Sequence, residues 1–317
     1  MAITFTEGKS FAADLMTDLN TAILANADWT RPNSGTRPTT YKCTTTRGAQ
    51  MVLDLADTGG IGTARMIVAA YTSYDGTTLG DKTGTTRYLN YKGIAAGTTA
   101  TNWIYWTLSI SKEHFFLMVE GPRPGEANAD NVTYGSVRNY IFMCDLVPYF
   151  DSGVDPEPVV IFGATQSTST DAYSLNSHKA YASESIGDNP WTPGNLLTLD
   201  FPSLSGSPVT TRVGPDDNYY LSPYVFFGDV DGIRGRLSHL FYAGVNTNFD
   251  TSPLSLPPVG SFVTYDDVIY KLLAVNKTTG ASGNGSVQWG ALGDAGIGQT
   301  SSAHRSVIVA VPHADAP

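Results

Sequence analysis

The clearest alternation of hydrophobic and polar positions lies between residues 103 and 120. From Trp103 to Ser111 apolar and polar side chains take turns, with Ile104, Trp106, Leu108 and Ile110 in one set and Tyr105, Thr107 and Ser109 in the other. Because successive side chains of a strand point to opposite faces, this pattern predicts a strand with one face in the core. A turn at Ser111–His114 leads into the apolar run Phe115–Glu120. The two segments therefore predict an antiparallel hairpin.

One segment near the N-terminus has a helical period instead. Between residues 10 and 26 the apolar side chains that share one helical face are Phe11, Leu15, Leu19, Ala22 and Ile23. We predict an amphipathic helix over 10–26, with Ser10 as its N-cap and with Leu15, Leu19 and Ile23 buried. The next segment, 30–40, contains Pro32 and Pro38 and is predicted to be an extended connector.

Further short apolar runs, bounded by residues that favour turns, predict more strands. They are Met51–Leu55, Met66–Tyr71, Tyr140–Phe150 (interrupted by Asp145 and Pro148), Val159–Phe162, Asn195–Phe201, Tyr219–Phe227, Ser261–Tyr265, Val268–Val275 and Ser306–Val311. A turn at Asp266–Asp267 joins two of these runs. The predicted fold class is mainly β: antiparallel, sandwich-like sheets with one N-terminal amphipathic helix.

An acidic stretch flanked by prolines, 151–158, suggests a division of the chain. We expect residues 1–150 to form a helix plus an antiparallel β domain. Residues 159–317 would form a loop-rich second β region that ends in a small β unit from about 259 to 317. Long Ser/Thr/Asn/Gly-rich loops are predicted at 166–190, 203–218 and 278–303, and loops of that length are often functional.

Composition and charge exclude several classes of protein. Only 15 % of the 317 residues are charged, and the formal net charge is −10. The 19 basic residues are thinly scattered, which argues against a nucleic-acid partner because phosphate binding depends on clustered Lys and Arg. No apolar run reaches the ~18 residues that span a bilayer, so no membrane span is expected. The first residues also lack the pattern of a signal peptide. Cys43 and Cys144 are predicted to be buried, reduced thiols rather than a disulfide or a metal pair.

Candidate chemistry is sparse. None of the five histidines forms a local metal-binding spacing, and His114 is predicted to be solvated in its turn, with His304 and His313 also at the surface. Asp229–Gly232 resembles the start of a calcium loop, but Leu240 stands where the final Glu ligand belongs, so a tight turn is favoured. Arg234 and Arg236 could hold an anion, although pairing with carboxylates is the simpler interpretation. The prediction is that no residue is catalytic, cofactor-binding or metal-binding, and that the chain is not an enzyme.

Several segments together resemble virion structural proteins of tailed bacteriophages. They are the helix leading into Asp28-Trp29-Thr30, the hairpin from Trp103–Trp106 to Met118–Glu120, Tyr134-Gly135 with Tyr140-Ile141, Asp216–Tyr224, Gly235–Leu237 leading to Phe241–Gly244, and Phe262–Lys271. The resemblance implies a many-copy subunit of the neck, tail or baseplate. Its partners would be identical subunits in a symmetric ring or cluster and other virion proteins. The location implied is the virion, after synthesis in the bacterial host cytoplasm.

Two other classes of function stay open. A receptor- or carbohydrate-binding module of a phage tail or fibre would use an exposed indole as a stacking platform, for which Trp103, Trp191 and Trp289 are the candidates. A polysaccharide hydrolase would need two carboxylates placed across a cleft, and no pair in the sequence stands out for that role.

Overall fold

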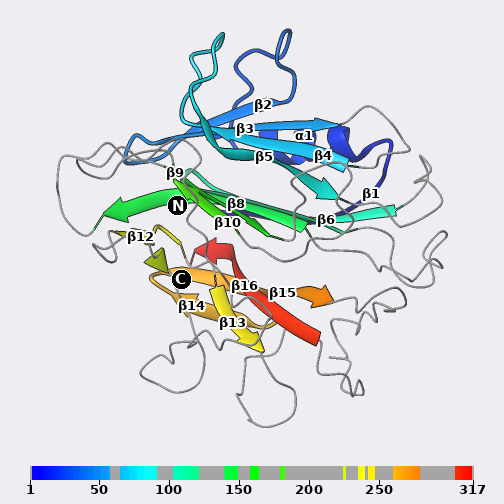
Figure 1. The fold of residues 1–317 in the computed structure, drawn as a ribbon, viewed down its shortest axis with the longest axis vertical. Coiled ribbons are helices and arrows are strands. Elements are labelled where there is room, and N and C mark those ends of the chain that lie inside the picture. The colour runs from blue at the N-terminus through cyan, green and yellow to red at the C-terminus, as the bar shows by residue number, and fades with distance from the viewer. Residues whose placement is uncertain are drawn as a thin grey trace.

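The computed structural model describes three antiparallel sheets and one helix. The three sheets lie one above another as layers, with the N-terminus in the middle layer and the C-terminus in the lower one (Figure 1). The described residues are 2–57, 65–90, 103–120, 139–148, 158–163, 179–182, 224–225, 235–239, 242–246, 260–278 and 304–315. The mainly β, sandwich-like fold predicted from the sequence is confirmed.

The middle layer is an eight-stranded sheet. Its strands are β1 (Thr4–Phe11), β6 (Trp103–Ile110), β7 (His114–Glu120), β8 (Asn139–Pro148), β9 (Pro158–Gly163), β10 (Lys179–Ala182), β11 (Tyr224–Val225) and β12 (Gly235–Leu237). The main path runs β1-β6-β7-β8-β12-β11, and β8 also pairs with β9, which pairs with β10. The predicted hairpin is confirmed as β6 and β7, which pair with Ile110 opposite Phe115.

The upper layer combines a four-stranded sheet with the helix. Its elements are β2 (Thr40–Thr44), β3 (Gln50–Asp57), β4 (Arg65–Tyr71), β5 (Lys82–Asn90) and α1 (Leu15–Leu24). Leu15, Leu19 and Ile23 of α1 share one buried cluster with β2–β5 and with the upper face of the middle sheet, to which β6 contributes Ile104, Trp106, Leu108 and Ile110. The predicted burial of Leu15, Leu19 and Ile23 and of one face of β6 is confirmed, and the structure shows that both meet in a single apolar core.

The start of the helix differs from the prediction. Ser10 and Phe11 belong to strand β1, and α1 begins only at Leu15. Ser10 does not cap the helix: its hydroxyl donates to Asp18 Oδ2 at 2.5 Å and accepts a hydrogen bond from Trp106 Nε1 at 2.9 Å. Pairing of the whole of β1 with β6 thus outweighs the local tendency of residues 10–14 to be helical.

The lower layer is the C-terminal sheet, in the order β13-β16-β15-β14. Its strands are β13 (Tyr242–Asn246), β14 (Phe262–Tyr265), β15 (Val268–Thr278) and β16 (His304–Asp315). The predicted turn between β14 and β15 is confirmed, with φ of 48° at Asp266 and 63° at Asp267. A register shift between β15 and β16 pairs Ile269 with Ala314 and Tyr270 with Pro312, so His313 is the extra residue of a bulge.

Two predictions about connections are wrong. Residues 32–36 form successive turns instead of an extended connector, because Asn33 accepts hydrogen bonds from Arg37 N at 2.8 Å and Thr36 N at 3.2 Å. Asp145 does not interrupt its strand, since it lies within β8 opposite Pro158 of β9. Pro158, the last residue of the acidic stretch 151–158, belongs to β9, which pairs with β8. A division into 1–150 and 159–317 would therefore run through one sheet.

Other predicted elements lie outside the described residues. These are Asn195–Phe201, most of Tyr219–Phe227, and most of the loops 166–190, 203–218 and 278–303. In the described part of the chain, no helix has the length and apolar character needed to cross a membrane.

Candidate functional site

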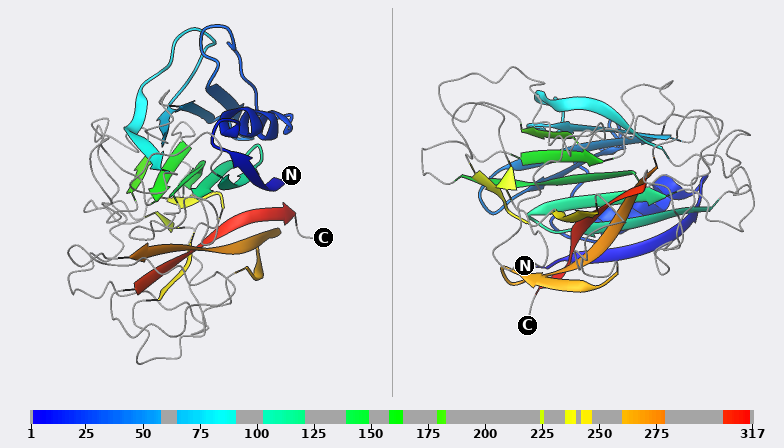
Figure 2. Two further views of the ribbon diagram at one scale, coloured as in Figure 1. Left: turned by 90° about the vertical axis from the view of Figure 1, so that its right-hand side faces the viewer. Right: turned by 60° about the horizontal axis from the view of Figure 1, so that its bottom comes forward.

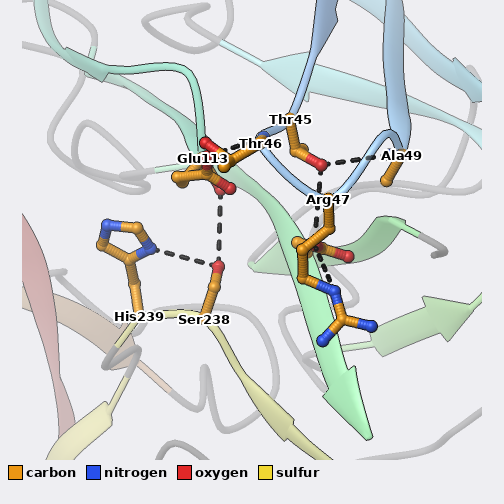
Figure 3. A network of polar contacts seen from close by, with 8 residues as sticks. Thr45, Thr46, Arg47, Ala49, Glu113, Ser238 and His239 are labelled. Atoms are coloured by element: carbon orange, nitrogen blue, oxygen red, sulfur yellow. Dashed lines mark hydrogen bonds and ion pairs between the residues drawn. The ribbon is translucent and has the colours of Figure 1, made fainter. Parts of the chain in front are cut away.

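A cluster of polar side chains, most of them buried, lies where the middle sheet meets the turns above it and the C-terminal sheet below it. The part drawn in Figure 3 joins the β2–β3 turn to the β6–β7 turn and to Ser238 and His239, which follow β12. We call it the polar cluster and define it by Thr45, Thr46, Arg47, Ser109, Ser111, Glu113, His114, Asp145, Ser238 and His239.

Two carboxylates anchor the upper part of the polar cluster. Glu113 Oε1 accepts a hydrogen bond from Thr46 N at 2.8 Å, and Asp145 Oδ2 lies 3.4 Å from Arg47 Nε and 3.5 Å from Thr45 Oγ1. The Asp145 side chain is fully buried, whereas that of Arg47 is 37 % exposed. A buried charge needs a partner of this kind. The two acids therefore hold the β2–β3 turn down on the middle sheet.

His114 lies at the centre of a chain of hydrogen bonds that defines its tautomer. Ser109 Oγ donates to the carbonyl oxygen of Pro312 in β16, so it accepts from His114 Nε2–H at 2.8 Å. The other ring nitrogen, Nδ1, then accepts from Ser111 Oγ at 2.8 Å, and Ser111 Oγ itself accepts from Glu113 N at 3.0 Å. This chain connects the β6–β7 hairpin to the C-terminal sheet.

The sequence prediction for His114 is wrong. Its side chain is fully buried at the first position of β7, not solvated in a turn. Burial lowers the pKa of His114 well below its usual range, and the neighbouring His239 lowers it further. Both ring nitrogens are satisfied by serine hydroxyls, so the imidazole is neutral.

His239 packs beside it. The two imidazole centroids are 4.6 Å apart, and the His239 ring also meets Tyr270 of β15 edge-on, at 6.5 Å. Burial lowers the pKa of His239 to about 4, against an opposite effect of Asp266 and Asp315. Ser238 contacts His239 Nδ1 at 3.1 Å and donates to the carbonyl oxygen of Glu113 at 3.4 Å (Figure 3).

A serine within hydrogen-bond reach of a histidine raises the question of nucleophilic catalysis. A serine nucleophile gives its proton to a basic ring nitrogen. Here the proton of Ser109 is directed to Pro312, and the facing nitrogen of His114 is itself a donor. Ser109 is also completely buried and is covered by β16. In this arrangement the pair stabilises the contact between two sheets and has no access to a substrate.

The cysteines confirm the sequence prediction. Cys43 and Cys144 are both free and buried. Burial raises the pKa of each thiol to about 12, so neither is a thiolate near neutral pH. Among the residues that the structure describes, no group of three or more His, Cys, Asp and Glu side chains is arranged to hold a metal ion.

The only described member of the three tryptophan candidates is Trp103, because Trp191 and Trp289 lie outside the described residues. Its indole is half-buried and stacks on Phe11 at 3.9 Å with an interplanar angle of 21°. Lys9 Nζ lies 4.4 Å from the Trp103 ring centroid and 5.0 Å from that of Tyr105. The 37 % exposure of Phe11 leaves an aromatic surface at this end of β1 and β6.

Sequence reasoning missed the polar cluster almost entirely. Its members come from turns and strands far apart in the sequence, and one of them, Ser109, contacts Pro312, 203 residues away. Asp229–Gly232 lies outside the described residues, and so do Arg234 and the side chain of Arg236. The one signal available was the polar set of the β6 alternation, which holds Ser109 at a position now seen to face a second sheet.

The comparisons with known proteins found no relative of this chain. No protein-family model, no curated protein and no solved structure matches this chain.

Proposed function

We propose that this chain is a structural subunit of a tailed-bacteriophage particle, located in the neck, tail or baseplate and present in several copies around a symmetry axis. It would be held there by its own copies and by other virion proteins, without catalysing a reaction. The resemblance of its segments to virion proteins motivates the proposal, and one feature of the C-terminal sheet supports it.

That feature is the edge strand β14. Edge strands expose unpaired backbone groups, and proteins usually protect them with charged residues or prolines. The edges β1, β2 and β5 each carry a lysine: Lys9, Lys42 and Lys82. By contrast, β14 reads Phe-Val-Thr-Tyr and, like the edges β11 and β13, has neither a charge nor a proline. Its Phe262 is 53 % exposed. An unprotected, partly aromatic edge is suited to contact with another polypeptide chain.

The polar cluster supports a structural role in a different way. Its hydroxyls, imidazoles and carboxylates are used to join the middle sheet to the layers above and below it. A catalytic group must instead reach a substrate and exchange a proton with it. The same residues that would be candidates for chemistry are here the connections between layers.

The assembly proposal is tested by changing the exposed edge. Phe262→Lys places a charge on β14, and it should leave the melting temperature of the isolated chain nearly unchanged because the side chain is already half-exposed. Incorporation into particles should fall at least about tenfold, since burying an unpaired charge in an interface costs more than about 1.4 kcal/mol.

A matched control is Leu24→Lys, at an apolar position of α1 with 37 % exposure. This variant should enter particles normally. Quantitative mass spectrometry of purified particles measures both variants against the unmodified chain. Normal incorporation of Phe262→Lys would exclude β14 as an assembly contact. Absence of the unmodified chain from purified particles would contradict the virion assignment itself.

A second candidate function is a receptor- or carbohydrate-binding module, and the aromatic surface of Phe11 and Trp103 favours it. Sugar rings stack on aromatic faces, and the nearby Lys9 could approach an acidic sugar. A glycan array with the unmodified chain and Trp103→Ala decides the matter. Binding that is lost in Trp103→Ala would support this function, and no binding to any glycan would remove it.

A further inference from the structure

The junction between the middle sheet and the C-terminal sheet is built from side chains that change charge with pH. On the lower face of the middle sheet His114 is completely buried, and His239 is 4 % exposed. The C-terminal sheet contributes the Tyr270 ring and the carbonyl oxygen of Pro312 to the same place. The two views of Figure 2 show this sheet as a separate layer that crosses below the middle one.

The contacts of this junction require neutral imidazoles. His114 uses Nε2–H as a donor to Ser109 and Nδ1 as an acceptor from Ser111. A second proton on Nδ1 would remove that acceptor. The His239 ring, 4.6 Å away, would then face a positive charge in a place that water does not reach.

The charged and titratable groups around the pair offer little compensation. Cys144, opposite His114 on β8, is a neutral thiol, and Tyr270 on β15 is a phenol. Glu113 and Asp145 bind the β2–β3 turn through Thr46 and Arg47. From the C-terminal sheet, Asp266 and Asp315 favour protonation of His239, while Lys271 pairs with Glu7 and His313 contacts Phe5. Among the described residues, Asp266 and Asp315 are therefore the opposite charges that favour a buried imidazolium at His239.

We propose that His114 and His239 form an acid-sensitive latch, which releases the C-terminal sheet from the middle sheet when both imidazoles take up protons. The proposal concerns the fold of this chain and does not depend on a role in a virion. In the open state both rings reach water and bind protons readily. In the closed state they do not, so acid shifts the equilibrium towards opening.

The direction and pH range follow from proton linkage. An exposed histidine has a pKa of about 6.5, whereas burial holds His239 at about 4 and His114 well below its usual value. The closed state is therefore fully stabilised above pH ~6.5 and loses stability as pH falls toward about 4. Across this range the opening constant rises by up to about tenfold per pH unit for each histidine, and by up to about 100-fold for the two together.

Hydrogen–deuterium exchange on the full chain, corrected for the intrinsic pH dependence of exchange, measures this opening. Between about pH 7 and about pH 5.5 the opening constant of amides in β15 and β16 should rise at least tenfold. Amides of β3 and β4, which contact the apolar core, should change less than about threefold. An equal loss of protection in all three sheets would overturn the proposal, because the chain would then unfold as one unit.

Two substitutions assign the effect to the histidines. His239→Phe keeps an aromatic ring against His114 and Tyr270, and His114→Gln keeps an N–H donor for Ser109. The double variant should lose the acid dependence of β15 and β16. His313→Phe, on the half-exposed bulge of β16, should keep it. If the double variant does not fold, His239→Phe alone should halve the slope of the logarithm of the opening constant against pH. An unchanged slope in whichever variant folds would overturn the proposal.

Discussion

The two faces of the middle sheet make different kinds of contact with the layers that cover them. Its upper face meets α1 and the β2–β5 sheet in one continuous apolar core, which includes Leu19, Leu53 and Leu108. Its lower face meets the C-terminal sheet through His114, His239 and the Ser109–Pro312 contact, beside a small cluster of Tyr270, Leu272 and Ala310. Two layers of the same chain are thus held to one sheet by unlike forces.

The difference has consequences for stability. Apolar burial contributes about 25 cal/mol per Å² and does not depend on pH. A buried hydrogen bond adds only about 1 kcal/mol, but breaking it leaves an unsatisfied group at a cost of about 1–3 kcal/mol. The upper junction should therefore be the more stable one under most conditions. The lower junction should depend more strongly on the exact geometry of its hydrogen bonds, and it should be more sensitive to acid.

The largest expected effect is in the upper junction. Leu19 is fully buried on α1, so Leu19→Asp places a carboxylate in the apolar core and should lower the free energy of unfolding by about 4 kcal/mol or more. Thr17→Asp, at an exposed position of the same helix, should change it by less than about 0.5 kcal/mol. Urea denaturation measures both. An unchanged melting temperature for Leu19→Asp would show that this face of α1 is not part of the core.

A smaller loss of stability is expected at Gly8, where β1 packs closely against the Trp106 side chain. A Cβ atom on Gly8 would lie 2.0 Å from Trp106 Cζ2, and the indole is held by its hydrogen bond to Ser10. Gly8→Ala should therefore destabilise the chain by about 2–3 kcal/mol through overpacking. Gly35→Ala is the control, because its nearest neighbouring atom is 3.8 Å away. Equal thermal stability of the two variants would contradict the close approach of Trp106 to β1.

The next change affects the lower junction alone. Ser109→Ala removes the acceptor for His114 Nε2–H and the donor to Pro312, at an expected cost of about 1–3 kcal/mol. The loss should be seen as faster exchange in β15 and β16, with little change in β3 and β4. Ser34→Ala, in an exposed turn, serves as the control. Faster exchange of all three sheets in Ser109→Ala would mean that the two junctions are not independent.

The smallest effect is expected for the ion pair at the rim of the lower junction. Lys271 Nζ lies 2.7 Å from Glu7 Oε1, but the Glu7 side chain is 51 % exposed, so solvent and salt screen the pair. Lys271→Met should cost less than about 1 kcal/mol, and the cost should shrink further in high salt. Double-mutant analysis with Glu7→Gln measures the coupling. A coupling above about 2 kcal/mol would make this pair a main connection of the C-terminal sheet.

The same contrast explains which parts of the structure could be predicted. The buried residues of the upper core could be predicted because each element shows a regular hydrophobic period. Examples are the alternation around Leu108 and the helical stripe of Leu15, Leu19 and Ile23. The lower junction could not be predicted, because no sequence pattern links Ser109, His239 and Pro312, which lie in different elements. His114 has the local sequence of a turn residue, and only the packing of the C-terminal sheet against the middle sheet makes it a buried, neutral imidazole.

The start of α1 shows the limit of local patterns even in the upper layer. Phe11 fits the helical stripe, yet it belongs to β1 because pairing with Trp103 and stacking on its indole outweigh one more helical turn. A hydrophobic pattern within about a dozen residues cannot show that two strands about 90 residues apart in the chain will pair.

The central claim is that the upper and lower junctions of the middle sheet differ in stability. Native-state hydrogen exchange, measured as a function of urea concentration at neutral pH, tests this claim most directly. The measurement compares amides of Leu55 and Val68 in the upper sheet with those of Leu272 and Val309 in the C-terminal sheet. We predict that the C-terminal amides open at a lower free energy and with a smaller dependence on urea, because only one layer is released. A single free energy and a single urea dependence for all four would contradict this account.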